Sequence, residues 1–172
     1  MPAKLTVCRH FTAQNPDPYA GIVWKTFTSA IKNPDGSPVF SADSLEFPDT
    51  WEQNAVDIVA AKYLRKAGVP IFDSWGSPVV DPETGIQVTG AENSMRQIAD
   101  RLAGAWTVWG QRAGLFATET DAENYRDEIR YMLIRQMAAP NSPQWFNTGL
   151  YEAYGLEEDK KVTFTTILIL ER

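Results

Sequence analysis

A short segment near the C-terminal end of the sequence holds the residues best placed for binding chemistry. Pro140 is unfavourable inside a helix, and Ser142 followed by Pro143 is typical of an N-cap and the first position of a new helix. The backbone N–H groups at such a helix start, with the positive end of the helix dipole behind them, suit an anion such as phosphate. The other interpretation is that Ser142 only caps its own helix.

Three amide side chains surround this serine and are weaker candidates for ligand contacts. Asn141, Gln144 and Asn147 can donate and accept hydrogen bonds, but the same groups often serve local turns and caps. A basic cluster of Lys62, Arg65 and Lys66 could meet a phosphate, and a solvated helix face is the alternative.

Other catalytic or metal-binding patterns are weaker in this sequence. Cys8 and His10 form a Cys-x-His pair, but two ligands do not complete a structural zinc site, which needs four. His10 is the single histidine, so a catalytic triad would require it beside Ser142, and a solvated position is the alternative. No glycine-rich phosphate loop of the Walker or Rossmann type occurs. We therefore predict no catalytic residue and no metal ligand in this chain.

The elements that must position these residues can be predicted from turn and cap residues. Residues 22–31 are rich in β-branched and aromatic types, residues 33–36 supply a turn, and Val39 and Phe40 resume an apolar strand, which predicts a β-hairpin. Residues 71–93 indicate a second loop or hairpin, with its turn at residues 81–85.

Helical periodicity begins after the first hairpin. Asp49 and Glu52 predict a capping box before a helix that Gly68 and Pro70 would end. A second helix is expected over residues 94–110, and a third from Thr120, with Glu123 completing another capping box, to Pro140. We expect an α+β fold, mainly α, with an N-terminal β-hairpin arm followed by a bundle of three to four helices.

Composition indicates a soluble, cytoplasmic protein. The chain has 172 residues, a net charge of −6 and a single cysteine. The absence of a basic excess argues against nonspecific nucleic-acid binding, and one cysteine rules out an internal disulfide framework. The longest apolar run, residues 167–170, is far too short to span a membrane, and no signal-peptide pattern occurs at the N-terminus.

Several runs of the sequence together resemble the N-terminal region of adenosylcobalamin-dependent (class II) ribonucleotide reductases. The resemblance extends from about residue 20 to residue 157. The runs follow the order found in that family, and they are residues 33–37, 55–58, 62–70, 101–106, 109–110 and 140–150.

The resemblance implies reduction of ribonucleotides to 2′-deoxyribonucleotides for DNA synthesis, with adenosylcobalamin as the cofactor of the complete enzyme. It gives Ser142 a role in contacting the ribonucleotide substrate, with Asn141, Gln144 and Asn147 as weaker candidates. The family's radical cysteine and its two redox cysteines lie in a ten-stranded α/β barrel beyond the matched region, and Cys8 matches none of them. We therefore expect a barrel domain or subunit as partner, and neither activity nor cofactor binding by this chain alone.

The expected organisation is an N-terminal arm with the hairpin over residues 1–48, a helical reductase domain over 49–157 and a divergent tail over 158–172. The tail is β-branched and apolar over 162–170, which suggests either an edge strand or a poorly satisfied end with a risk of aggregation. It also resembles the product of a truncation or frameshift. Two alternatives to an enzyme fragment remain open: a regulatory module that associates with an intact reductase, and a nonfunctional remnant.

Overall fold

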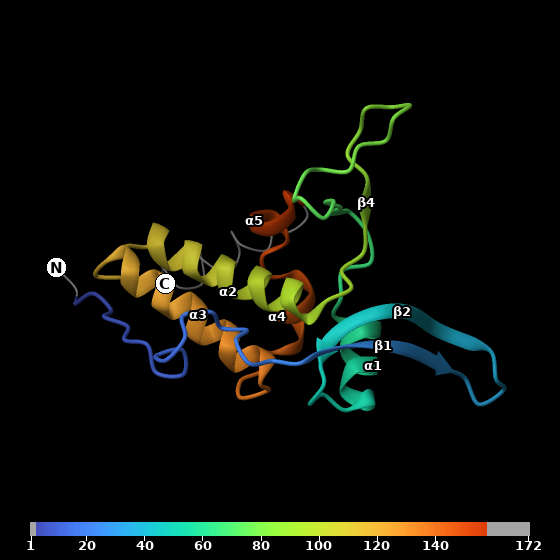
Figure 1. Cartoon of the computed structure of the whole chain (residues 1–172), viewed down its shortest axis with the longest axis horizontal. Coiled ribbons are helices and arrows are strands. Elements are labelled where there is room, and N and C mark those ends of the chain that lie inside the picture. The colour runs from blue at the N-terminus through green and yellow to red at the C-terminus, as the bar shows by residue number, and fades with distance from the viewer. Residues whose placement is uncertain (1–2, 158–172) are drawn as a thin grey trace, which may run out of the picture.

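The computed structural model describes residues 3–157 and shows an α+β fold, which confirms the predicted fold class. A β-hairpin comes first in the chain, and the longer helices lie beside one another (Figure 1). The predicted tail at residues 158–172 lies outside the described residues. The elements in chain order are β1 (Trp24–Lys32), β2 (Pro38–Pro48), α1 (Gln53–Lys62), β3 (Val69–Pro70), β4 (Thr89–Gly90), α2 (Met95–Arg112), α3 (Glu119–Ile134), α4 (Ser142–Asn147) and α5 (Leu150–Tyr154).

The first hairpin forms where turn chemistry predicted it. Strands β1 and β2 pair antiparallel, with Trp24 opposite Pro48 and Lys32 opposite Pro38. The turn is closed by a hydrogen bond of 2.8 Å from the Asn33 N–H to the Ser37 carbonyl, and Gly36 takes a positive φ of 86°. Strand β2 continues well beyond the Val39–Phe40 run that signalled it.

Helix α1 is shorter than predicted at both ends. The expected capping box is wrong, because the helix begins at Gln53 after Glu52, and no side chain caps it. The helix ends at Lys62 rather than near Gly68. The intervening residues instead form a loop whose positions are fixed by tertiary hydrogen bonds, including one of 2.8 Å from the Arg65 backbone N–H to Glu92.

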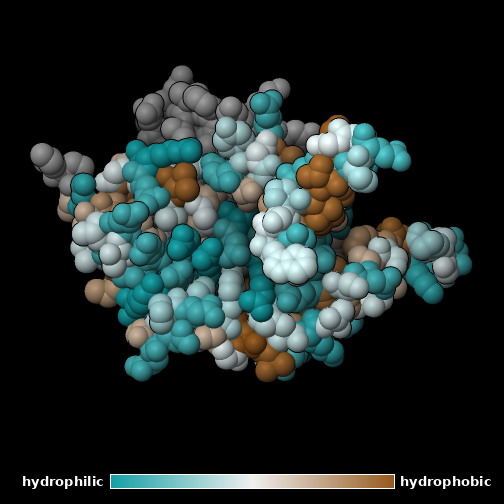
Figure 2. All heavy atoms as spheres, turned by 45° about the horizontal axis from the view of Figure 1, so that its top comes forward, coloured by the Kyte–Doolittle hydropathy of each residue, from teal (hydrophilic) through white to brown (hydrophobic). Residues whose placement is uncertain are grey.

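Residues 69–90 form a second hairpin-like arm, as predicted. Strands β3 and β4 pair at its base, and the Asp81 side chain accepts hydrogen bonds of 2.9 Å from the Glu83 and Thr84 N–H groups in its turn. The arm projects away from the helices (Figure 1), and hydrophobic side chains lie on its surface (Figure 2). Its exposed large hydrophobic residues are Ile71, Phe72, Trp75, Val80 and Ile86.

Helices α2 and α3 pack side by side and form the main helical layer (Figure 1). Ser94 caps α2, and Gln97 completes a capping box at its start. The predicted start of α3 is wrong by two residues, because Thr118 is the N-cap and Asp121 completes the box. Helix α3 also ends at Ile134, before the predicted stop at Pro140.

One hydrophobic core joins the hairpin to the helices. Strands β1 and β2 contribute Phe27, Leu45 and Phe47, which are buried against residues of α1, α2 and α3. The Trp51 indole N–H donates a hydrogen bond of 2.8 Å to the Ile134 carbonyl and so ties the hairpin end to α3. No helix in the described residues is long and apolar enough to cross a membrane.

The N-terminal segment is held along α3 by hydrogen bonds to several side chains, and Glu128 accepts four of them. The Glu128 side chain accepts from the backbone N–H groups of His10, Phe11 and Thr12 and from the Thr12 hydroxyl, at 2.7 to 3.1 Å. Burial alone would raise the pKa of Glu128, but these hydrogen bonds outweigh it and hold the pKa below its ordinary value.

Candidate functional site

Helix α4 carries the candidate binding residues, but its cap differs from the prediction. The N-cap is Asn141, whose side-chain oxygen accepts a hydrogen bond of 2.9 Å from the Ser142 backbone N–H. The prediction that Ser142 is the N-cap is therefore wrong by one residue, since Ser142 is the first residue of the helix. Asparagine and serine are comparable as N-caps, so the sequence did not show which of these two adjacent residues takes the N-cap position.

The Ser142 hydroxyl is consequently available for contacts other than capping. It lies 3.3 Å from the Tyr63 hydroxyl, in an exposed position at the end of α1. The sequence gave no signal for the pairing of Tyr63 with Ser142. Together the two hydroxyls offer both donors and acceptors to a ligand.

The other predicted residues lie at different points along α4. Gln144 is exposed and Asn147 is half-buried, and neither side chain hydrogen-bonds to another residue that the structure describes. Asn147 lies five positions after Ser142, which corresponds to about 7.5 Å along a helix axis. The structure therefore places Asn141 and Ser142 together and Asn147 at the opposite end of the helix.

Aromatic stacking holds α4 against the end of α1. The Tyr63 ring stacks on Trp145 with ring centroids 5.7 Å apart, and on Phe146 with centroids 6.4 Å apart. Trp145 is buried, whereas 40% of Phe146 is exposed. The stack thus leaves one aromatic ring of α4 open to a ligand.

A fully buried arginine fixes the C-terminal end of α4. The Arg101 guanidinium donates hydrogen bonds of 2.9 Å to the Trp145 carbonyl and 2.6 Å to the Thr148 carbonyl. It also pairs with Glu92 at 2.8 Å, and both side chains are fully buried. These bonds satisfy carbonyls that the end of a helix leaves without partners.

Glu92 extends this network to two further segments. Its carboxylate accepts a hydrogen bond of 2.8 Å from the Tyr154 hydroxyl of α5, in addition to the bond from the Arg65 N–H. Burial, and then the Glu92 charge, raise the pKa of Tyr154. Sequence reasoning missed both Glu92 and Arg101. The available signal was a charged residue, Arg101, three positions after Ile98 on the apolar stripe of α2.

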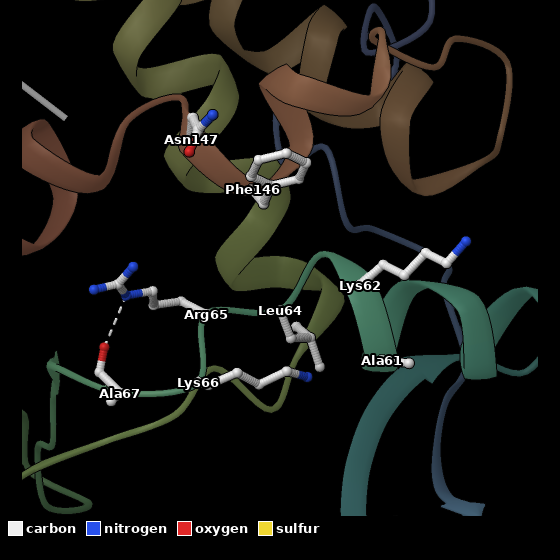
Figure 3. Close-up of a pocket in the computed structure, with 8 residues that line it drawn as sticks. All are labelled: Ala61, Lys62, Leu64, Arg65, Lys66, Ala67, Phe146 and Asn147. Atoms are coloured by element: carbon white, nitrogen blue, oxygen red, sulfur yellow. Dashed lines mark hydrogen bonds between the residues drawn. The ribbon is translucent and has the colours of Figure 1, made fainter. Parts of the chain in front are cut away.

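A pocket of about 420 Å³ lies between the loop after α1 and helix α4. Figure 3 shows Phe146 above this loop, with Asn147 and Arg65 on one side and Lys62 on the other. The pocket brings the predicted basic cluster together with α4, which sequence spacing did not show. The lining residues are Ala61, Lys62, Leu64, Arg65, Lys66, Ala67, Phe146 and Asn147.

The Cys8 and His10 pair does not form part of a larger cluster. Within residues 3–157, no group of three or more histidine, cysteine or acidic residues is arranged to hold a metal ion. The Cys8 thiol is exposed, and the His10 ring packs edge-on against Phe11 with centroids 4.7 Å apart.

Comparison with known proteins gives the class of this fold. Residues 25–136 match the sequence model of a family described as class II vitamin B12-dependent ribonucleotide reductase. The match begins in β1 and ends just after α3, so it covers the hairpin, the arm and the main helical layer.

Individual relatives extend the similarity over most of the chain. The chain is 48% identical over 166 residues to the vitamin B12-dependent ribonucleotide reductase of Bradyrhizobium diazoefficiens, covering 87% of this chain and 13% of that protein. It is 43% identical over 165 residues to the reductase of Agrobacterium fabrum, with the same two coverages. It is 35% identical over 146 residues to the reductase of Streptomyces clavuligerus, covering 84% of this chain and 13% of that protein.

The chain therefore belongs to the class II vitamin B12-dependent ribonucleotide reductase family. It spans about one eighth of the length of these relatives.

Proposed function

We propose that this chain is the N-terminal part of a cytoplasmic reductase that converts ribonucleotides to 2′-deoxyribonucleotides, and that it acts only together with a catalytic barrel. The observation that carries the proposal is the 48% identity to a vitamin B12-dependent ribonucleotide reductase over most of the chain. In this proposal the radical and redox cysteines of the barrel carry out the reduction. The single cysteine of this chain matches none of them.

Ser142 supplies a substrate contact in this proposal. Its hydroxyl is exposed beside Tyr63, and it is not used to cap α4. Arg101 and the aromatic stack hold the helix from behind, so the hydroxyl is presented from a fixed backbone. Such preorganisation reduces the entropy that binding would otherwise cost. Asn141 and Gln144 lie near the same end of α4 and are secondary candidates.

Adenosylcobalamin would supply the radical in the complete enzyme. A corrin ring with its adenosyl group is larger than the ligands that a pocket of about 420 Å³ encloses. The residues described here do not fit the cofactor, and we assign its binding to the remainder of the enzyme.

The test is complementation in trans. The Bradyrhizobium diazoefficiens reductase would be expressed without the region that matches this chain, and mixed with the chain, adenosylcobalamin and a thiol reductant. We expect deoxyribonucleotide formation from the mixture and none from either polypeptide alone. A lack of both complex and product would contradict the proposal.

The role of Ser142 would be tested in the same mixture. We expect Ser142→Ala to raise KM about three- to tenfold, the size of one lost hydrogen bond. Ser74→Ala is the matched control, because Ser74 is an exposed serine on the arm. An unchanged KM for Ser142→Ala would show that the hydroxyl does not contact substrate.

A further inference from the structure

The projecting arm is held in shape by local hydrogen bonds. Backbone hydrogen bonds of 2.8 to 3.0 Å link Ile71, Val79 and Val88 to one another, so the short segments of the arm lie side by side. In its two turns, the Asp73 and Asp81 side chains each accept hydrogen bonds from two backbone N–H groups. None of the arm's residues, all of which the structure describes, belongs to the core cluster that joins the hairpin to the helices.

This ordered arm exposes a large apolar surface. Five of the twelve exposed large hydrophobic side chains in the described part of the chain lie on it, and 88% of Trp75 is exposed. Single exposed apolar residues are normal on a protein, but a group of them on one small element marks an interaction site. We call this group the arm surface, and its members are Ile71, Phe72, Trp75, Val80 and Ile86.

The charges of the arm indicate the chemistry of its partner. Residues 69–90 contain Asp73, Asp81 and Glu83 and no lysine or arginine. An apolar surface bordered only by carboxylates is complementary to an apolar groove bordered by lysine or arginine. A second copy of the chain would instead bring the same carboxylates and a net charge of −6, and like charges oppose that association.

The base of the arm is joined to the network that holds α4. The Glu92 N–H donates a hydrogen bond of 2.8 Å to the Arg65 carbonyl, and the Arg65 N–H donates one of 2.8 Å to the Glu92 carboxylate. These two bonds connect the segments that enter and leave the arm. Glu92 also pairs with Arg101, whose guanidinium donates to two carbonyls of the α4 segment. A partner that binds the arm therefore also sets the position of α4.

We propose that the arm surface docks into an apolar groove, bordered by lysine or arginine, on the catalytic part of the same reductase. The chain covers 13% of the Bradyrhizobium diazoefficiens relative, so most of the surface of that enzyme lies outside the matched region. The link between the arm and α4 favours the catalytic part as the partner, because binding the arm then also positions Ser142 against it. The inference rests on the proposed function, which supplies this partner.

The test is hydroxyl-radical footprinting of Trp75 in the intact chain alone and in a full-length chimera. The chimera is the Bradyrhizobium diazoefficiens reductase with residues 1–157 of this chain in place of its matching region. We expect the oxidation rate of Trp75 to fall about fivefold or more in the chimera, because a tryptophan that anchors an interface is desolvated. Leu115 is the control, since it is 50% exposed at the end of the helical layer opposite the arm (Figure 1), and its rate should not change.

Substitutions on the arm surface measure its contribution to docking. The double variant Trp75→Ser with Val80→Ser should weaken binding of the chain to the shortened reductase of the complementation mixture about thirtyfold or more. Leu115→Ser removes an exposed apolar side chain elsewhere and should leave the affinity unchanged. Ser74→Ala keeps the whole arm surface, so it remains a suitable control for Ser142→Ala.

Unchanged oxidation of Trp75, both in the chimera and in the mixture with the shortened reductase, would overturn the proposal. An equal loss of affinity in Leu115→Ser and in the double variant would do the same, because apolar surface anywhere on the chain would then serve as well. Protection of Trp75 in the chain alone that increases with concentration would assign the arm surface to a second copy instead.

The docking and the proposed function can fail separately. Deoxyribonucleotide formation by the chimera without protection of Trp75 would support the proposed function and contradict the docking. Protection of Trp75 without any product would support the docking and count against the proposed function.

Discussion

Arg101 is a fully buried cation whose hydrogen bonds reach two carbonyls of the α4 segment and one carboxylate. Removing a charge from water costs several kcal/mol, and only a well-paired geometry recovers that cost. The pairing with Glu92 at 2.8 Å, together with the two carbonyl acceptors, supplies such a geometry. The contribution of Arg101 or Glu92 to the free energy of unfolding therefore depends strongly on the presence of the other.

We expect Arg101→Met to lower the free energy of unfolding by about 3 kcal/mol or more, because Glu92 is then left buried without its partner. The double variant Arg101→Met with Glu92→Gln should recover part of that loss, since the orphaned charge is gone. Urea denaturation of the three proteins measures both effects. A double variant less stable than the single variant would contradict the orphaned-charge explanation.

Gly149 is held where a side chain would collide with the same arginine. An added Cβ would lie 2.3 Å from the Arg101 carbonyl oxygen, and φ is +80°. Gly149→Ala should therefore destabilise the protein by more than Gly155→Ala, which has a φ of +71° but open space around its Cβ position. Thermal unfolding of both variants separates close contact from backbone strain, and equal shifts in Tm would rule out the contact.

At the scale of the elements, residue pattern predicted the hairpin turn and helix α2 well, because both carry unambiguous local signals. Gly36 takes the positive φ of the turn, and Ser94 with Gln97 forms the capping box. The ends of α1 and α3 were predicted less well. Two threonines compete near the start of α3, and local sequence does not determine which one packs at the helix end.

The start of α3 gives a direct comparison. Thr118→Ala should destabilise the protein by about 1 kcal/mol, the usual cost of a lost N-cap. Thr120→Ala, at the position that local sequence favoured, should change the free energy of unfolding by less than about 0.5 kcal/mol. Chemical denaturation distinguishes the two, and a larger effect at Thr120 would contradict the observed cap.

The attachment of the N-terminal segment to α3 should depend on pH. Hydrogen bonds lower the folded-state pKa of Glu128 below its ordinary value of 4.5, so its stabilising contribution is present above that pH. The contribution is lost as pH falls through the lowered pKa. We expect the difference in unfolding free energy between wild type and Glu128→Gln, about 2 kcal/mol at pH 7, to shrink in acid. A difference that is constant from pH 7 to pH 2 would contradict this mechanism.

At the scale of the whole molecule, we expect the core and the projecting arm to contribute separately to the free energy of unfolding. The core joins β1, β2 and the helices, whereas Trp75 on the arm is 88% exposed. Trp75→Ser should change the free energy of unfolding by less than about 0.5 kcal/mol, while Trp51→Ser, at a buried position, should cost about 3 kcal/mol or more. Urea denaturation compares the two, and a large loss at Trp75 would show that the arm supports the core.

The candidate site was only partly predictable because its parts come from distant segments. The resemblance at residues 140–150 indicated α4 and Ser142, since that signal is continuous in sequence. Tyr63 and Arg101 contact α4 only through the fold, Glu92 reaches it through Arg101, and each of the three looks locally like an ordinary helix or loop residue. Burial of a paired charge depends on tertiary structure, and no short-range pattern encodes it.

Because Arg101 and the aromatic stack hold α4 from its buried side, the outward face of the helix contributes little to its own placement. We therefore expect substitutions at the exposed Ser142 and Gln144 to leave the backbone that carries them in place. The arrangement separates the support of a recognition helix from its chemistry, and it makes this short helix a surface on which new ligand preferences can be built by substitution alone.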